Sequence, residues 1–362
     1  MYIETPFNFT GSKFKILNQI LPLFDYEKKI FVDLFAGGGS VYANVLDKYD
    51  KVLANDIISD LILIQKKLIL TDGVIDKVKG LCVNKDDKEG YLELRKSYNE
   101  NKTPEKLWAL MLCCTNNMLR FNQKFEFNQT FGKRTFNSNT EKKVLNYIES
   151  VRPHKKKLMF SSKRFNDIPI VMRSFYYIDP PYGYIMNEDG TMGNKQISEA
   201  GYNAYYKKSD DESLYNYVHK INDVGATFLM SGVLEHGGQR SWILNKLIEE
   251  GFNHSVINFD YDKVSRKKND KETKEIVVFN YRTNQKDDGF LIETQNGEKI
   301  PFGFFYVKGN AIEIKGKVIG KYNDSKTAKI VSKQIAMSFK NGIKLYKMPS
   351  EDVDISKKWY NN

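Results

Sequence analysis

The residues best suited to chemistry lie directly after a short apolar run, in the sequence Asp179-Pro180-Pro181-Tyr182. Residues 175–178 predict a buried strand of a parallel sheet, and the two prolines end it because they lack backbone donors. Asp179 and Tyr182 should therefore lie at the carboxyl end of a strand, where open α/β sheets bind ligands. A carboxylate, the Pro180 carbonyl and an aromatic face can together hold a flat ring that bears an amino group. The alternative is an ordinary turn, with Asp179 as a cap and Tyr182 as packing.

A second group of residues surrounds a glycine cluster, Gly37-Gly38-Gly39, between two predicted strands at 29–35 and 51–54. This order is typical of nucleotide-binding half-domains: a strand, a glycine-rich turn, a second strand and then an acid, here Asp56. In such half-domains the acid binds a ribose. The glycines lack the spacing of a nicotinamide site, and Asp33 lies inside the first strand, where it could bind a cationic amino-acid end. Asp33, Asp56 and a nearby aromatic residue would suit the ammonium, the ribose and the adenine of S-adenosylmethionine. A strand-to-helix turn without a ligand is the alternative.

Together these two groups predict methyl transfer to an exocyclic amine. The lone pair of adenine N6 is delocalised into the ring, so this nitrogen is a weak nucleophile. Hydrogen bonds from N6 to the Asp179 carboxylate and the Pro180 carbonyl would favour a tetrahedral nitrogen and stabilise the positive charge that develops on it. Tyr182 would stack on the base, and no metal is needed. A base inside duplex DNA cannot reach such a pocket, so it must be flipped out of the helix.

The composition agrees with a nucleic-acid partner. The 362 residues, enough for two domains or for one domain with an insertion, carry a net charge of +11. Such a charge favours a polyanion, with nucleic acid ahead of an acidic membrane surface. Three cysteines, two of them adjacent, and four scattered histidines indicate neither a disulfide framework nor a metal site. Because the sequence has no signal-peptide pattern and no apolar run of membrane-spanning length, we expect a cytoplasmic protein that does not insert into membranes.

The remaining pattern predicts the elements that would position these residues. A helical spacing of apolar residues follows residue 13, a helix begins near Val41, and a largely helical stretch runs from 59 to 118. Residues 120–138, rich in Asn, Phe, Lys and Arg, predict a surface hairpin, and residues 183–200 are polar enough to predict a mobile loop. Further strands are expected at 157–161, 226–231, 255–261 and 275–281, with helices at 211–223 and 242–250. Past residue 283, short β-like runs and one helix, 325–339, predict a small appended domain.

With this order of motifs the chain resembles the Dam-type DNA adenine-N6 methyltransferases, including those of bacteriophages, over residues 5–282. The shared order is Phe9-Thr10-Gly11-Ser12-Lys13, Asp33-Leu34-Phe35-Ala36-Gly37-Gly38, Ala54-Asn55-Asp56-Ile57, an insertion, and Asp179-Pro180-Pro181-Tyr182. The resemblance implies an α/β fold, namely a Rossmann-like class I methyltransferase mixed sheet with helices on both faces, at 1–57 and 141–282. It also implies an inserted, mostly helical DNA-recognition domain with a β-hairpin at 58–140. Residues 283–362 would then form a small α+β C-terminal extension of unknown role.

The resemblance also implies roles for individual residues. The catalytic residues would be Asp179, Pro180 and Tyr182. The methyl donor S-adenosylmethionine would be bound by Phe9, Lys13, Asp33, Phe35, Gly37, Asp56, Phe165 and Asp179.

In the hairpin, Arg120 matches an arginine that contacts a guanine, as bidentate pairing would allow. Asn116 matches a residue that enters the base stack beside the flipped base. Asn122, Asn128 and Arg134 complete the residues expected to contact DNA. The basic side chains in the loop 263–274 would contact phosphates, which predicts salt-dependent binding.

Several positions depart from the family pattern. Thr130 replaces a proline, Arg164 stands before Phe165 where an acid is usual, and Gly232 follows Ser231 where Asn or Asp is frequent. The favoured recognition site is GATC, although related hairpins also read longer sites that begin with GAT. The alternative functions are methylation of an RNA adenine or a protein amide, and a non-catalytic DNA-binding module with a vestigial cofactor pocket. We expect a monomer that acts on double-stranded DNA, with a companion restriction endonuclease as a candidate partner.

Overall fold

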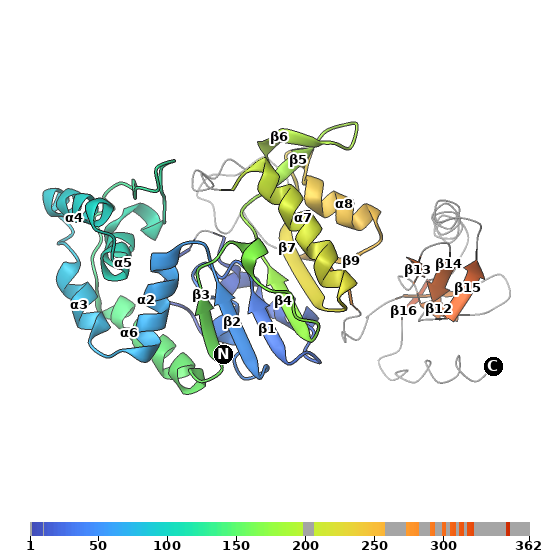
Figure 1. The fold of residues 1–362 in the computed structure, drawn as a ribbon, viewed down its shortest axis with the longest axis horizontal. Helices are drawn as coiled ribbons and strands as arrows, with labels where there is room; N and C mark the ends of the chain where they lie inside the picture. Colours follow the sequence, from blue (N-terminus) through green and yellow to red (C-terminus); the bar gives the residue numbers. More distant parts are fainter. Residues whose placement is uncertain are drawn as a thin grey trace. The chain divides into compact units, whose positions relative to one another are not determined.

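The computed structural model describes residues 2–9, 11–197, 206–257 and 273–281, together with the backbone of six strands between residues 290 and 347. The chain divides into two compact units, Met1–Thr283 and Asn284–Asn362. In Figure 1 the colours follow the sequence, from blue in the N-terminal part to orange and red in the last described strands. All residues with a predicted role in chemistry or DNA contact belong to the first unit.

The first unit is built around an eight-stranded sheet with the order β3-β2-β1-β4-β7-β10-β9, in which the short β8 pairs with β7. The strands from β3 to β7 are parallel to their neighbours, and β10 is antiparallel to both β7 and β9. The strand order reverses between β1 and β4, so a crevice is expected at the carboxyl ends of these strands. The strands are β1 Ile30–Asp33, β2 Lys51–Asn55, β3 Leu158–Ser161, β4 Ser174–Ile178, β7 Thr227–His236, β8 Gln239–Arg240, β9 Asn253–Ile257 and β10 Thr273–Phe279.

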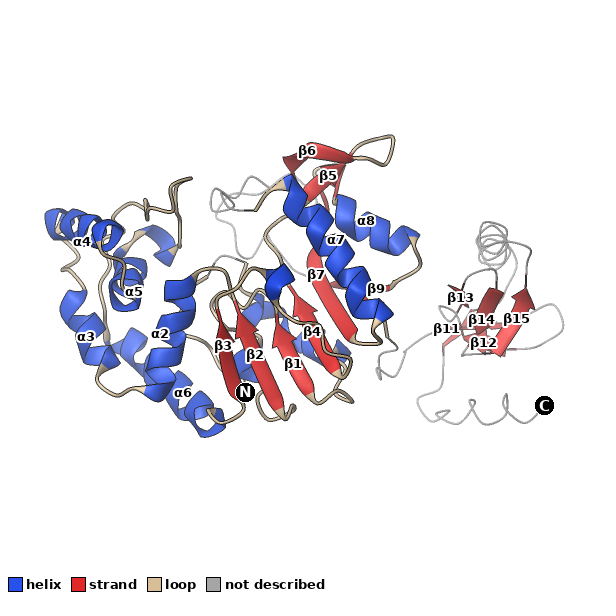
Figure 2. Ribbon diagram, in the orientation of Figure 1, coloured by secondary structure: helices blue, strands red, loops and turns tan. Residues whose placement is uncertain are grey.

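Successive side chains on each strand point to opposite faces of the sheet, and this alternation divides the core into two layers. Phe31 of β1 and Phe175 of β4 belong to the layer packed by α1 (Leu17–Ile20) and α2 (Ser59–Leu70). Their neighbours Val32 and Tyr176 belong to the layer packed by α7 (Lys208–Asp223) and α8 (Trp242–Glu249). Figure 2 shows α7 and α8 together over the β4–β7 part of the sheet. The predicted mixed α/β fold, with helices on both faces, is confirmed.

A cluster of helices continues from α2, which packs beside the edge strand β3 (Figure 2). At its centre is α5, where nine of the ten residues are buried and where α2, α3 and α4 all make contact. The helices are α3 Val74–Leu81, α4 Lys88–Glu100, α5 Pro104–Cys113 and α6 Ser138–Val151. Short 3₁₀ turns occur at η1 Lys13–Ile16, η2 Leu21–Leu23, η3 Tyr42–Asn44, η4 Thr115–Asn117, η5 Arg152–His154 and η6 Phe165–Asp167. Among the described residues, no helix is both long and apolar enough to cross a membrane.

The segment 120–138 doubles back on itself, as predicted, but without a continuous strand pair. An isolated antiparallel bridge from Phe121 to Phe127 joins its two sides, and a second bridge connects Phe131 to Cys114, directly after α5. Phe121 and Phe127 are buried against the helical cluster. We predicted a surface hairpin here because the segment contains few aliphatic residues. In the structure its aromatic side chains anchor the segment instead.

Two expected elements differ in the structure. The helix predicted near Val41 is only the 3₁₀ turn η3, because the chain must re-enter the sheet at Lys51. The predicted mobile loop 183–200 contains an antiparallel hairpin of β5 (Tyr184–Met186) and β6 (Met192–Gln196). Its turn is closed by Asp189, whose Oδ1 accepts from the Thr191 amide at 2.9 Å, and by Gly190 with φ of +81°. Residues 198–200 lie outside the described residues.

The second unit contains two three-stranded sheets, ordered β12-β11-β16 and β13-β14-β15. Their strands are β11 Phe290–Glu293, β12 Lys299–Pro301, β13 Phe305–Lys308, β14 Ala311–Ile314, β15 Lys317–Lys321 and β16 Leu345–Lys347. The helix predicted at 325–339 lies outside the described residues. So do residues 258–261 of the strand expected at 255–261, and the loop residues Lys263, Arg266, Lys267, Lys268 and Lys271. Lys274 is in β10.

Candidate active site

One large cavity opens at the carboxyl ends of β1, β2, β4 and β7, where the topology predicts a ligand site. Its walls combine glycine-rich backbone, aromatic rings and several carboxylates. All ten residues predicted for catalysis or cofactor binding line this cavity: Phe9, Lys13, Asp33, Phe35, Gly37, Asp56, Phe165, Asp179, Pro180 and Tyr182. They come from five separate segments of the chain, and the fold brings them together. Their roles remain predictions from the sequence.

The glycine-rich turn after β1 approaches the N-terminal segment very closely. Gly37 has a φ of +49°, and a Cβ added to it would lie 2.9 Å from the Phe9 ring. The Gly37 amide donates to Asp56 Oδ2 at 2.9 Å, and the Ile58 amide donates to Asp56 Oδ1 at 2.9 Å. Burial raises the pKa of Asp56, while these two backbone donors oppose the shift. Asp56, directly after β2, is thereby held in place, and it lines the cavity.

Asp33 is deeply buried, with 1% of its surface exposed. Its Oδ2 accepts from the Tyr42 amide at 3.2 Å, whereas Oδ1 has no hydrogen-bond partner among the described residues. Burial and the nearby charge of Asp179 raise the pKa of Asp33 well above its usual value. An unpaired, buried carboxylate oxygen in a cavity wall is costly unless a ligand satisfies it. A cationic group such as an ammonium would suit this oxygen.

A buried polar network that the motifs did not reveal connects the glycine-rich turn to α2. Gln65 of α2 is fully buried and donates to the Gly37 carbonyl at 2.9 Å. Its Oε1 accepts from the Tyr42 hydroxyl at 2.7 Å, and Tyr42 is 2.6 Å from the hydroxyl of Tyr147 on α6. The sequence signal for this network is a glutamine on the apolar side of a helix that otherwise presents leucine and isoleucine.

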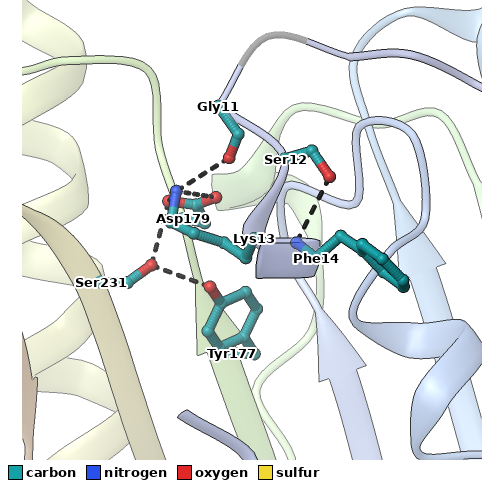
Figure 3. Close-up of polar contacts among 7 residues, drawn as sticks. All are labelled: Gly11, Ser12, Lys13, Phe14, Tyr177, Asp179 and Ser231. Atoms are coloured by element: carbon teal, nitrogen blue, oxygen red, sulfur yellow. Dashed lines mark hydrogen bonds and ion pairs between the residues drawn. The ribbon is translucent and has the colours of Figure 1, made fainter. Parts of the chain in front are cut away.

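Asp179, directly after β4, is held by two side chains, Lys13 and Ser231 (Figure 3). The Lys13 ammonium lies 2.7 Å from Oδ1 and 2.8 Å from Oδ2 of Asp179. The Ser231 hydroxyl donates to Oδ1 at 3.0 Å, and Ser231 is itself 2.9 Å from the Tyr177 hydroxyl. The carboxylate therefore has a fixed orientation, and Lys13, predicted to bind the cofactor, contacts Asp179 directly.

Two further aromatic side chains complete the walls. The ring of Phe165 is buried and lies 5.5 Å from the ring of Phe35. Tyr182 also lines the cavity, and burial together with the nearby acids Glu275 and Asp179 raises its pKa to about 12. Tyr182 is therefore neutral at physiological pH, and its ring can stack on a planar group.

Arg164, which stands where the family pattern has an acid, pairs with the buried acid Asp210 at the start of α7. Asp210 and its neighbour Asp211 both line the cavity, and neither was predicted from the sequence. Both acids lie in the first turn of α7, after a polar stretch. At such a position an acid is usually interpreted as a helix cap, which is why the sequence did not indicate a role in the cavity.

The predicted DNA-contacting residues lie outside the main cavity, on the turn-rich segment after α5. The Arg120 guanidinium donates from Nε to Asn128 Oδ1 at 2.9 Å and from Nη2 to the Asn128 carbonyl at 3.0 Å. These bonds use one edge of the guanidinium, so the edge formed by the two Nη groups is the one that a guanine would meet. Asn122 closes the turn at residues 122–126, because its Oδ1 accepts hydrogen bonds from the amides of Lys124 and Glu126.

Asn116 and Asn117 form a strained turn beside the cavity. Both have left-handed backbones, with φ of 57° and 54°. Asn116 is exposed and lines a groove with Phe9 and Ser12, which also line the main cavity. Arg134 donates to Asn117 Oδ1 at 2.6 Å, so this arginine holds the turn. Such strain persists only where surrounding contacts fix it, and it is concentrated at functional sites.

The fold and the site define a class I methyltransferase, and comparison with known proteins agrees. The family model of D12 class N6 adenine-specific DNA methyltransferases matches residues 9–202, which include the glycine-rich turn, the hairpin segment and Asp179-Pro180-Pro181-Tyr182. The chain therefore belongs to this family.

Several characterised relatives share this similarity. The modification methylase StsI of Streptococcus sanguinis is 30% identical over 294 residues, which are 78% of this chain and 43% of that protein. The type II methyltransferase M.FokI of Planomicrobium okeanokoites is 28% identical over 77% of this chain and 43% of its own length. The DNA adenine methylase of Serratia marcescens is 25% identical over 59% of this chain and 76% of its length. The chain thus spans less than half of the first two relatives.

Proposed function

We propose that this protein transfers a methyl group from S-adenosylmethionine to N6 of a flipped-out adenine in double-stranded DNA. The observation that carries the proposal is the shared cavity, where the oriented Asp179 carboxylate and the partnerless Asp33 Oδ1 lie in one site. One acid suits the amine that receives the methyl group, and the other suits the ammonium of the donor.

The residues present fit S-adenosylmethionine. Asp33 offers a buried acceptor to the ammonium group, and Asp56 offers acceptors to the ribose hydroxyls. The ring pair of Phe35 and Phe165 provides an apolar wall for the adenine. Gly37 permits a backbone approach that a Cβ would block. When bound, this donor supplies an activated methyl group on a sulfonium.

The chemistry required of the protein itself is positioning and charge stabilisation. Asp179 accepts a hydrogen bond from the amino group of the target base, and the Pro180 carbonyl, which precedes a residue without an N–H, accepts the second. Both acceptors face a nitrogen that becomes positively charged, so their interaction with it strengthens toward the transition state. Tyr182 stacks on the base and holds the nitrogen in line.

The Lys13 ammonium forms an ion pair with the Asp179 carboxylate. The amino group of the target base must therefore share that carboxylate with Lys13 or displace the lysine from it. Lys13 also donates to the Gly11 carbonyl at 3.0 Å, which gives its ammonium a second acceptor when the base arrives. The cost of moving this lysine is therefore limited by a partner already in place.

Sequence recognition is assigned to the segment from Asn116 to Arg134, with Arg120 reading a guanine. The favoured site is GATC, or a longer site beginning with GAT. The net charge of +11 and the relatives' names as modification or type II methyltransferases support a DNA substrate and a companion restriction endonuclease. We also propose that the protein acts as a monomer. The same proposal divides the chain into a catalytic part (1–57 and 141–282), a recognition part (58–140) and an extension (283–362).

The test is a transfer assay with product identification. Purified protein is incubated with labelled S-adenosylmethionine and, separately, with unmethylated duplex DNA, RNA of the same sequence and a protein mixture. The expected product is N6-methyldeoxyadenosine, detected by mass spectrometry after digestion of the DNA. Label confined to RNA or protein would replace the proposed substrate, and calorimetric binding of the donor without any transfer would identify a vestigial cofactor pocket.

A further inference from the structure

Asp211, in the first turn of α7, is a buried acid that the proposed chemistry does not use. Its side chain is fully buried and lines the main cavity. Its Oδ2 accepts from the backbone amide of Tyr184 at 2.6 Å, and its Oδ1 accepts from the Tyr206 hydroxyl at 2.7 Å. Tyr184 is only two residues beyond Tyr182, so this carboxylate holds the backbone as it leaves the catalytic motif.

Asp211 also lies close to Gly183, the residue before Tyr184. A Cβ added at Gly183 would lie 2.7 Å from Asp211 Oδ2 and 3.0 Å from Oδ1. The Gly183 carbonyl accepts from the Ile197 amide at 2.9 Å, so the peptide between Gly183 and Tyr184 is fixed from two elements. Only a residue without a side chain lets the backbone come this near to the carboxylate.

The neighbouring acid performs a different task. Asp210 accepts from the Lys207 amide at 2.8 Å and pairs with Arg164, beside the Phe165 wall. The first turn of α7 therefore contacts the cavity at two points, and Asp211 is the one directed to the catalytic motif. An ordinary helix cap would accept amides from its own helix, whereas Asp211 accepts from an amide 27 residues away in sequence.

We infer that Asp211 is a positioning residue for methyl transfer, which acts by holding the Gly183–Tyr184 backbone so that Tyr182 and the Pro180 carbonyl face the target base. This inference rests on the proposed function. Because Asp211 contacts the backbone directly after the motif, at the Tyr184 amide, its loss should lower turnover while the affinity for S-adenosylmethionine is retained.

The hydrogen bonds of Asp211 can form with or without a charge. Burial raises the pKa of Asp211 to about 6, with Asp210 and Glu212 adding to the shift and the Tyr184 and Tyr206 donors opposing it. If the side chain is neutral, one oxygen still accepts from the Tyr184 amide, and the other can donate to the Tyr206 oxygen. Asparagine offers the same pair of contacts in nearly the same shape, so Asp211→Asn is a conservative rescue variant.

The test compares Asp211→Ala, Asp211→Asn and the matched control Glu212→Gln, an exposed acid one residue along the same helix. Steady-state kinetics on duplex DNA give kcat, and calorimetry gives the donor Kd independently of activity. We expect Asp211→Ala to lose roughly 10- to 100-fold in kcat, as for a displaced reacting group, with the donor Kd unchanged. Asp211→Asn and Glu212→Gln should keep kcat within about threefold of the unmodified protein.

A second variant keeps the inference testable if Asp211→Ala does not fold. Gly183→Ala forces a Cβ against the carboxylate, so it should displace the same stretch of backbone and lower kcat while the donor Kd is unchanged. An unchanged kcat in a folded Gly183→Ala variant would contradict the positioning role. Unchanged kcat in a folded Asp211→Ala variant, or equal losses for Ala and Asn, would overturn the positioning role. If the unmodified protein itself transfers no methyl group to DNA, the proposed function fails, and that result is distinct from a failure of this inference.

Discussion

The cavity with the predicted catalytic residues and the predicted recognition segment, Asn116 to Arg134, hold their side chains in different ways. In the cavity, Asp33, Asp56 and Asp179 are placed by the ends of parallel strands and are oriented largely by backbone amides or buried partners. In the recognition segment, Arg120 and Arg134 are oriented by Asn128 and Asn117, whose own backbones lie in irregular turns. The first arrangement is determined by the fold, whereas the second depends on contacts that these arginines make with asparagines in turns.

This difference suggests how the two functions could change separately. A substitution at a strand end disturbs the cavity and leaves the turns after α5 intact. A substitution in the turns alters which edge of a guanidinium faces DNA and leaves the cavity intact. Catalysis and sequence discrimination should therefore be separable by mutation.

The largest effect is expected for Asp179→Ala. The variant loses the acceptor that stabilises the charged nitrogen, so turnover should fall by about 100-fold or more, while DNA binding measured by fluorescence anisotropy stays near the original value. Turnover close to that of the unmodified protein would remove Asp179 from the catalytic role and with it the contrast between the two regions.

Asp33→Asn should weaken donor binding with little effect on DNA binding. The variant keeps the shape of the side chain but cannot accept a charged hydrogen bond at Oδ1, which is expected to cost about 1.5–3 kcal/mol of binding free energy. Isothermal titration calorimetry measures this loss directly. A donor Kd equal to that of the unmodified protein would show that the ammonium binds elsewhere.

The same acid predicts a pH dependence with a defined sign. The pKa of Asp33 is raised in the folded protein, so folding favours its protonated form, and that stabilisation is lost as the pH rises from the unfolded pKa through the folded one. The ammonium needs the ionised form, so donor affinity should increase with pH over the same window and then level off. Asp33→Asn is the control, and its donor affinity should lack this rise.

Arg120→Ala should narrow the gap between the correct site and single mismatches by about 1–3 kcal/mol. Asn128→Ala removes one of the two contacts that orient Arg120, so its effect should be smaller and should largely vanish beside Arg120→Ala. Competition assays with mismatched duplexes, arranged as a double-mutant cycle, measure the coupling. Additive effects would mean that Asn128 contacts DNA on its own account.

The smallest effect is expected for Arg134→Met. Loss of the bond to Asn117 loosens the left-handed turn, which should weaken DNA binding by about 0.5–1.5 kcal/mol for every sequence alike. Binding assays on correct and mismatched duplexes check this uniformity. A change in discrimination instead would make Arg134 a base-reading residue.

The sequence predicted the cavity well because its signals are local. The strand before Asp179 and the glycine-rich turn before Asp56 are contiguous patterns, and parallel pairing then brings their ends together. The supports were missed because Gln65, Ser231 and Asp211 act across long stretches of chain, and each alone resembles packing or a cap. The hairpin β5–β6 was read as a loop because its polar residues hide the alternation, and its buried Met192 gives only a weak signal. The helix expected near Val41 failed because too few residues separate η3 from β2.

The most direct test of the account is a map of N6-methyladenine on unmethylated genomic DNA after incubation with the purified protein and S-adenosylmethionine. We predict marks confined to one short motif that contains GAT, with none in a parallel reaction with Asp179→Ala and additional near-cognate sites with Arg120→Ala. An absence of marks from the unmodified protein, or an unchanged map from Asp179→Ala, would contradict the claim that this cavity methylates adenine in DNA.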